Sequence, residues 1–145
     1  MSILQQHVRR AASVLALAAL LGACSHGPHQ PGGHDVTLTG AQEVPANTST
    51  ASGNSSIRVA HDRSVSGGVR YTDMLATVAH IHEAPVGANG PVIVPLVKTA
   101  DGMFAVPAGT LLTPSQHASY QAGNLYVNVH SAAYPAGEIR AQLKP

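Results

Sequence analysis

Residues 125–143 read LYVNVHSAAYPAGEIRAQL and carry the clearest secondary-structure signal in the chain. The stretch contains two short runs in which every second residue is apolar, separated by a segment with Pro135 and Gly137. A side-chain period of two is that of a β-strand with one buried face, and proline and glycine are typical of turns. Two half-buried strands are therefore predicted. Their apolar positions are Leu125, Val127 and Val129 in the first run and Ile139, Ala141 and Leu143 in the second.

Further short runs of this kind lie upstream, divided by turn residues. They occupy residues 36–38, 57–59, 69–71 and 78–82. Residues 92–94 are continuously apolar, which predicts a strand buried on both faces, and Asp101-Gly102 predicts a hairpin turn. About seven or eight short strands with turn signals between them favour a sandwich or a barrel over a βαβ fold.

One helix is predicted near residue 114. Thr113 is a suitable N-cap, Pro114 suits the first helical position, and Gln116 completes a capping box. Gly123 is expected to end this helix after a few turns. We therefore expect a single all-β sandwich domain over residues 35–145, with one short connecting helix.

The composition excludes several classes of function. Charged residues make up 10% of the chain and the formal net charge is +1, so we expect no nucleic acid as a partner. Aromatic residues make up 3%, without Trp, which argues against stacking platforms for bases. The sequence has no Gly-x-Ser-x-Gly turn, phosphate loop or dinucleotide fingerprint. No catalytic residues are identified, and a binding or structural module is favoured over an enzyme.

The N-terminal segment, residues 1–23, has the pattern of a secretory signal. A basic region ending at Arg10 precedes an apolar run too short to span a bilayer permanently. Residues 21–24, Leu-Gly-Ala-Cys, resemble the bacterial lipoprotein box, in which the cysteine is lipidated. Cys24 is the one cysteine of the chain. The alternative is an ordinary signal cleaved near Ala23, which leaves a free thiol.

Lipidation would anchor the protein in the bacterial cell envelope through its N-terminus. Ser25 follows the cysteine, which favours the outer membrane, on its periplasmic or surface side. Residues 24–34 are rich in His, Gly and Pro and are expected to form a flexible tether. The expected partners are the membrane, through the lipid, and an envelope protein or glycan.

Three histidines fall on the polar faces of the predicted strands. His80 and His82 alternate with Ala79 and Ile81, so their side chains share one face. The polar face of the next run is Tyr126, Asn128 and His130, and that of the last run contains Glu138 and Arg140.

These positions allow two interpretations. His80, His82 and His130 would suit copper or zinc if their strands are neighbours, with Glu138 or water as a fourth ligand. Alternatively, they belong to a hydrated sheet face and bind Asn128, Glu138 or loop carbonyls, while Arg140 pairs with Glu138. The sequence does not establish that the strands are adjacent.

Four segments resemble the CHRD domain, a module named after the developmental protein chordin. They are residues 38–45 (LTGAQEVP), 79–82 (AHIH), 90–96 (GPVIVPL) and 125–143. The resemblance implies an immunoglobulin-like or similar antiparallel β-sandwich, and it transfers no catalytic residues.

The alternative function is a metalloenzyme or metal carrier of the copper–zinc superoxide dismutase kind. Those enzymes use a fuller ligand set, with a bridging histidine and an aspartate. Besides the three histidines above, this domain contains two candidates for the additional ligands: His61, beside a predicted turn, and His117, in the predicted helix.

Overall fold

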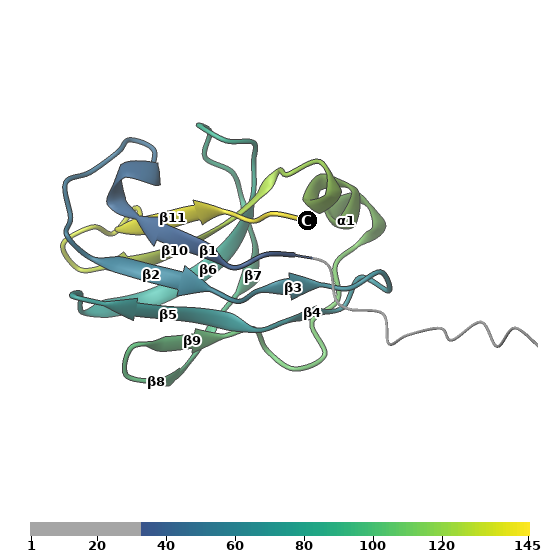
Figure 1. The fold of residues 1–145 in the computed structure, drawn as a ribbon, viewed down its shortest axis with the longest axis horizontal. Helices are drawn as coiled ribbons and strands as arrows, with labels where there is room; N and C mark the ends of the chain where they lie inside the picture. The colour runs from purple at the N-terminus through teal and green to yellow at the C-terminus, as the bar shows by residue number, and fades with distance from the viewer. Residues whose placement is uncertain (1–32) are drawn as a thin grey trace, which may run out of the picture.

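The computed structural model describes residues 33–145 as an antiparallel β-domain with one short α-helix (Figure 1). The predicted signal peptide, Cys24 and most of the predicted tether lie outside the described residues. The strands are β1 (Val36–Thr39), β2 (Ser52–Ser55), β3 (Arg58–Val59), β4 (Val65–Ser66), β5 (Gly68–Thr72), β6 (Ala76–Glu83), β7 (Val92–Pro95), β8 (Val97–Ala100), β9 (Met103–Ala105), β10 (Leu125–Ser131) and β11 (Ile139–Gln142). A 3₁₀ turn, η1 (Gly40–Gln42), follows β1, and α1 (Pro114–Gln121) precedes β10.

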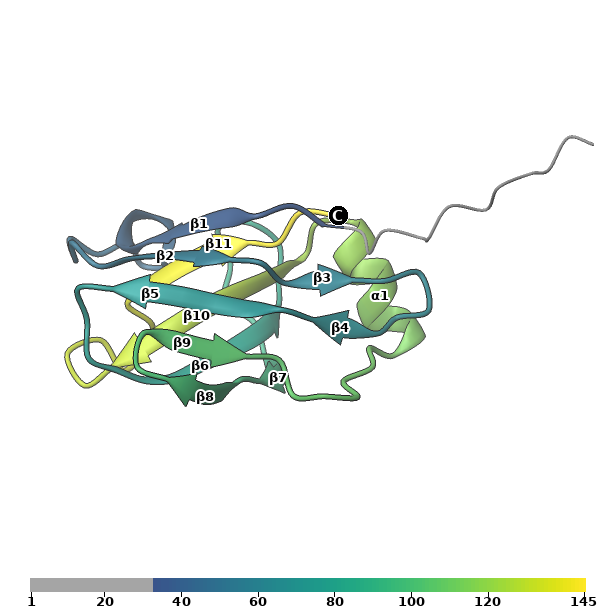
Figure 2. The same ribbon diagram turned by 60° about the horizontal axis from the view of Figure 1, so that its bottom comes forward.

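Nine strands form one sheet in the order β7-β6-β10-β11-β1-β2-β5-β9-β8, and β3 pairs with β4 separately. The two ends of the sheet are consecutive in the chain, because β7 and β8 are separated by Leu96 alone. β7 pairs with β6 and β8 pairs with β9, so residues 92–100 join both ends. Figure 2 shows β1 along the top of the molecule and β7 and β8 along the bottom. The predicted all-β antiparallel fold is confirmed, in a form close to a barrel.

The apolar faces of the strands meet inside this nearly closed sheet. The alternation predicted for β6, β10 and β11 is confirmed, because Ala79, Val127, Val129 and Ile139 are all fully buried. The core continues on the opposite wall with Leu38, Val36, Val69 and Phe104.

Residues 92–94 form the predicted strand, as part of β7, but the prediction that it is buried on both faces was wrong. Val94 is buried, but Val92 is 47% exposed. β7 lies at the end of the sheet order and joins its neighbour through a register shift. Burial therefore changes along the strand: Val92 and Pro95 are exposed, although residues 92–94 are continuously apolar.

The sequence pattern gave no signal for β2, whose residues are Ser-Gly-Asn-Ser. It lies between β1 and β5 and pairs with both. Gly53 is buried there, and a Cβ at this position would lie 2.8 Å from the Arg70 carbonyl oxygen and 3.0 Å from Ile139 Cδ1. The close approach of the neighbouring strand therefore requires glycine at this position. Glycine interrupts the apolar alternation by which a strand is recognised in a sequence.

The predicted helix is confirmed together with its capping box. Thr113 Oγ1 accepts from the Gln116 backbone N–H at 3.2 Å, and Gln116 Oε1 accepts from the Thr113 backbone N–H at 2.9 Å. The helix ends before Gly123, which has a φ of 74°. It lies beside the C-terminus (Figure 1), where the buried Tyr120 donates its hydroxyl to the Lys144 carbonyl. Among residues 33–145, we find no helix with the length and apolar character needed to span a membrane.

The close packing at Gly53 gives a test of the fold. Gly53→Ala is expected to lower the free energy of unfolding by about 1–3 kcal/mol, because the added methyl group overpacks the space between β2 and its neighbours. Ser52→Ala, at an exposed position of the same strand, is the matched control and should change it by less than about 0.5 kcal/mol. Chemical denaturation measures both. Equal stabilities of the two variants would contradict the close approach.

Candidate functional site

The polar residues singled out in the sequence meet on three adjacent strands, β6, β10 and β11. Asn128, on the central strand, is the register partner of His80 on one side and of Arg140 on the other. Tyr126 is the partner of His82. The adjacency that the sequence left open is therefore present, and one sheet face gathers these side chains.

This face is largely buried. Asn128 and Arg140 are each 2% exposed, and every residue of β10 is buried. Three loops cover the face and bond to its side chains: residues 43–51, 84–91 and 132–138. Asn89 Nδ2 donates to the Val44 carbonyl at 2.7 Å, which ties two of these loops together. The second interpretation, a hydrated face, therefore differs from the structure in its exposure, because this face forms a second, polar core behind the apolar one. The bonds to loop carbonyls and Asn128 that it included are present.

The imidazole rings of His80, His82 and His130 cluster in this polar core. One ring nitrogen from each lies within 4.8 Å of the others. His80 Nδ1 and His130 Nε2 are 3.2 Å apart. His82 and His130 are each 8% exposed, and His80 is half-buried. We refer to these three residues as the histidine cluster.

Backbone carbonyls orient two of the rings. His82 Nδ1 lies 2.9 Å from the Gly90 carbonyl oxygen, and His130 Nδ1 lies 3.0 Å from that of Pro135. A carbonyl oxygen only accepts, so Nδ1 of each ring carries the hydrogen. In the neutral rings the lone pair is therefore on Nε2. His82 Nε2 is buried and has no hydrogen-bond partner.

Burial also affects the protonation of the cluster. Desolvation lowers the pKa of His80 and of His82, and the neighbouring imidazoles lower it further. Both rings are therefore held toward the neutral form. Neutral imidazole is the form that binds a metal ion.

The structure does not bring Glu138 to the histidine cluster. Its Oε1 accepts from Ser49 Oγ at 2.6 Å, on the loop that follows β1. Its carboxyl thus fastens a covering loop.

Arg140 does not pair with Glu138 either. Its guanidinium donates to Asn89 Oδ1 at 3.1 Å and to the Ala88 carbonyl at 2.8 Å. It also lies 3.4 Å from the centroid of the Tyr126 ring. Tyr126 in turn stacks on His82, with centroids 4.7 Å apart and planes 7° from parallel.

Sequence reasoning missed Glu43, which follows η1. The residue is 6% exposed, and its Oε1 has no hydrogen-bond partner. Burial raises its pKa from 4.5 to about 7, although the charge of Arg140, the Val44 N–H and the Asn128 side chain oppose this shift. Glu43 lies within the segment 38–45 that resembles the CHRD domain, but a loop carboxyl has no strand parity to show where it points.

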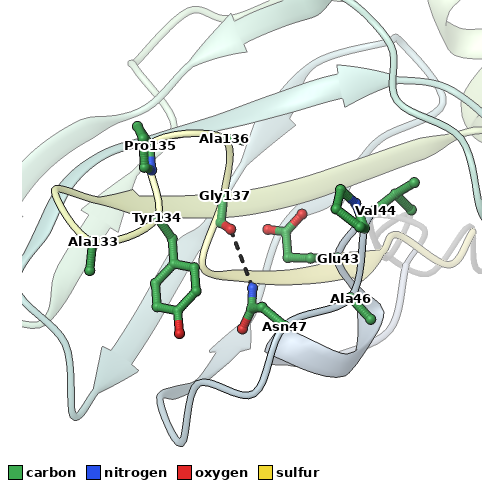
Figure 3. A pocket seen from close by; sticks show the side chains of 10 residues that line it. Glu43, Val44, Ala46, Asn47, Ala133, Tyr134, Pro135, Ala136 and Gly137 are labelled. Atoms are coloured by element: carbon green, nitrogen blue, oxygen red, sulfur yellow. Dashed lines mark hydrogen bonds between the residues drawn. The ribbon is translucent and has the colours of Figure 1, made fainter.

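Glu43 also borders a cleft between the first and third covering loops. The cleft has a volume of about 330 Å³ and is lined by Glu43, Val44, Asn47, Tyr134, Pro135 and Gly137, among others. Figure 3 shows the Glu43 carboxyl directed toward Gly137 across this cleft. Asn47 Nδ2 donates to the Gly137 carbonyl at 3.4 Å, which links the two loops.

The other histidines of the domain lie elsewhere. His61 is in the turn between β3 and β4, and His117 is on α1. Within residues 33–145, the histidine cluster is the one group of metal-ligating side chains found together. The described part of the chain thus has no second set of the kind that a two-metal dismutase needs.

The burial of Glu43 gives a prediction about pH. The folded protein retains this proton up to about pH 7, whereas the unfolded chain releases it near 4.5. The stabilisation by the neutral Glu43 side chain is therefore complete below about pH 4.5 and is lost as the pH rises to about 7. Relative to Glu43→Gln, the wild type should lose about 2–3 kcal/mol of unfolding free energy between about pH 5 and pH 8.

Denaturant unfolding at several pH values measures this difference. His80 and His82, whose lowered pKa values act in the opposite direction, are present in both proteins. Their contribution cancels in the comparison. Parallel pH profiles for the two proteins would show that Glu43 has an ordinary pKa.

Comparison with known protein families supports the resemblance of the four sequence segments to the CHRD domain. The family model for the CHRD domain matches residues 35–143, which include the apolar core, the covering loops and the histidine cluster. No curated protein and no solved structure matches the chain. The family points to a binding or structural module. With nearly all of the described residues matched, the chain belongs to the CHRD domain family.

Proposed function

We propose that this protein is an exported, lipid-anchored binding module of the bacterial envelope that holds one copper or zinc ion at the histidine cluster. The observation that carries the metal site is the orientation of His82 and His130. Each gives its Nδ1–H to a loop carbonyl, which leaves the lone pair of Nε2 available, and one nitrogen of each ring in the cluster lies within 4.8 Å of the others. Metal-binding histidines are oriented in this way by carbonyls and carboxylates around them.

The spacing of the nitrogens supports the same function. Two nitrogens bound at about 2.0–2.1 Å to one tetrahedral ion are about 3.3 Å apart. His80 Nδ1 and His130 Nε2 are 3.2 Å apart. The unpartnered lone pair of His82 Nε2 would gain a partner in such an ion, removing the cost of a buried, unsatisfied acceptor.

An ion at this site would also stabilise the covering loops. The carbonyls that orient the rings belong to Gly90 and Pro135, on the second and third loops. Ligand binding to the folded state alone shifts the unfolding equilibrium. This stabilisation would matter in an exported chain, because its single cysteine leaves it without an internal disulfide.

The proposal of export and anchoring rests on the sequence. Residues 1–24 combine a basic start, a short apolar run and Leu-Gly-Ala-Cys in the order of a lipoprotein signal. Residues 25–34 would then separate the lipid from the folded domain, which begins near Asp35. We place the protein in the outer membrane because Ser25 follows the cysteine.

Elemental analysis tests the metal site. The full-length protein, purified without a polyhistidine tag or chelating resin, should contain close to one equivalent of copper or zinc. His80→Ala/His82→Ala should lose it, since two of three ligands are removed. His117→Ala, a histidine outside the cluster, is the matched control and should retain it. Added Cu²⁺ or Zn²⁺ should raise the melting temperature of the wild type and not of the double variant.

A wild type that contains neither metal and shows no thermal shift with either ion would overturn the metal-binding function. The histidine cluster would then be structural, and a search for protein or glycan partners would follow.

Substitution of the cysteine tests the anchor. Cys24→Ser should move the protein from the membrane fraction to the soluble fraction, because the acyl chains that hold it in the bilayer are absent. Intact mass spectrometry should detect the lipid on wild-type Cys24 and none on the variant. Cleavage near Ala23 with an unmodified cysteine would support the ordinary secretory signal and refute the lipid anchor.

A further inference from the structure

The histidine cluster contains a fourth donor that is not a histidine. Asn128 Oδ1 lies 2.9 Å from His130 Nε2, and Asn128 is the register partner of His80. Its side chain is therefore directed into the cluster. Asn128 is 2% exposed, so water does not compete freely for this oxygen.

The contact between Asn128 and His130 brings two acceptors together. His130 Nδ1 already carries the hydrogen given to the Pro135 carbonyl, so Nε2 of the neutral ring presents a lone pair. The amide oxygen of Asn128 also presents lone pairs. Two acceptors at this distance repel each other unless a cation or an additional proton lies between them.

Rotation of the Asn128 amide by half a turn would remove the conflict, but Glu43 opposes it. The amide nitrogen of Asn128 faces the carboxyl of Glu43 beside Gly137. An added Cβ on Gly137 would lie 2.4 Å from Glu43 Oε1 and 2.8 Å from Asn128 Nδ2, so the carboxyl and the amide nitrogen border the same small space. Rotation would place the amide oxygen against that carboxyl, and the ionised carboxyl, which only accepts, would repel it. The carboxylate form of Glu43 therefore keeps Asn128 Oδ1 directed at the histidines.

We infer that Asn128 Oδ1 is the fourth ligand of the metal ion and that Glu43 is a positioning residue that orients it. This inference rests on the proposed function of the histidine cluster. It replaces Glu138 by Asn128 in the ligand set and assigns three nitrogens and one amide oxygen. Such a set, without sulfur, suits Zn²⁺ and Cu²⁺ better than Cu⁺, which prefers soft thiolate and thioether ligands.

The ligand role of Asn128 is tested with Zn²⁺ affinity and with Co²⁺ as a spectroscopic substitute for zinc. The full-length protein and its variants are titrated in competition with a chelating dye. Asn128→Ala should bind Zn²⁺ about 10–100-fold more weakly, and its visible Co²⁺ spectrum should change because water replaces the amide oxygen. Asn128→Asp, which restores an oxygen ligand, should recover most of the affinity. His117→Ala should match the wild type.

The positioning role of Glu43 is tested in the same titrations. Glu43→Leu removes the acceptor for the Asn128 amide and should weaken Zn²⁺ binding about tenfold. Glu43→Gln retains a side-chain oxygen that accepts this hydrogen bond, so it should bind within about threefold of the wild type. Circular dichroism of each variant verifies the fold. If Asn128→Ala does not fold, the spectra of Asn128→Asp and Glu43→Leu decide the matter, since both change the oxygen donor or its orientation.

The outcomes separate this inference from the proposed function. Wild-type affinity and an unchanged Co²⁺ spectrum in Asn128→Ala would overturn the fourth ligand and leave a three-histidine site. Equal losses in Glu43→Leu and Glu43→Gln would overturn the positioning role, because charge would then be what matters. A wild type that binds neither ion would overturn both the inference and the metal site.

Discussion

The structure depends on burial of both faces of strand β10, Leu125–Ser131. One face supplies Val127 and Val129 to the apolar core. The other carries Asn128 and His130, whose polar atoms lose water on folding. An unpaired buried polar group costs on the order of 1–3 kcal/mol. The fold is therefore possible only if the residues around this face supply partners for its polar atoms.

The covering loops supply most of these partners from their backbones. Carbonyls of Ala88, Gly90 and Pro135 accept from Arg140, His82 and His130. Loop carbonyls suit this role because an irregular segment leaves them outside the sheet ladder. Among the described residues, the buried side-chain atoms left without a partner are Glu43 Oε1 and His82 Nε2. Both belong to the polar core, and native proteins tolerate such atoms chiefly where they serve a function.

Strand parity predicted much of this arrangement. The alternation in residues 78–82 and 125–143 placed the three histidines, Asn128 and Arg140 on polar faces, as the structure confirms. It could not indicate what lies above those faces, because a period of two distinguishes the sides of a strand and not their coverage. For this reason a hydrated face was left open as one of two interpretations, and Glu43 was missed. β2 escaped detection for a different reason: close packing selects Gly53 there, which removes the apolar signal.

The polar core also connects the histidine cluster to the molecular surface. His82 stacks on Tyr126, Tyr126 lies under the guanidinium of Arg140, and Arg140 holds Asn89. Asn89 is exposed and bonds the Val44 carbonyl on the first covering loop. An ion that fixes the His82 ring would fix this series of contacts, since each member packs against the next. In a binding module, the surface formed by these loops would then depend on the metal, and loss of the ion would alter recognition at a distance from the ligands themselves.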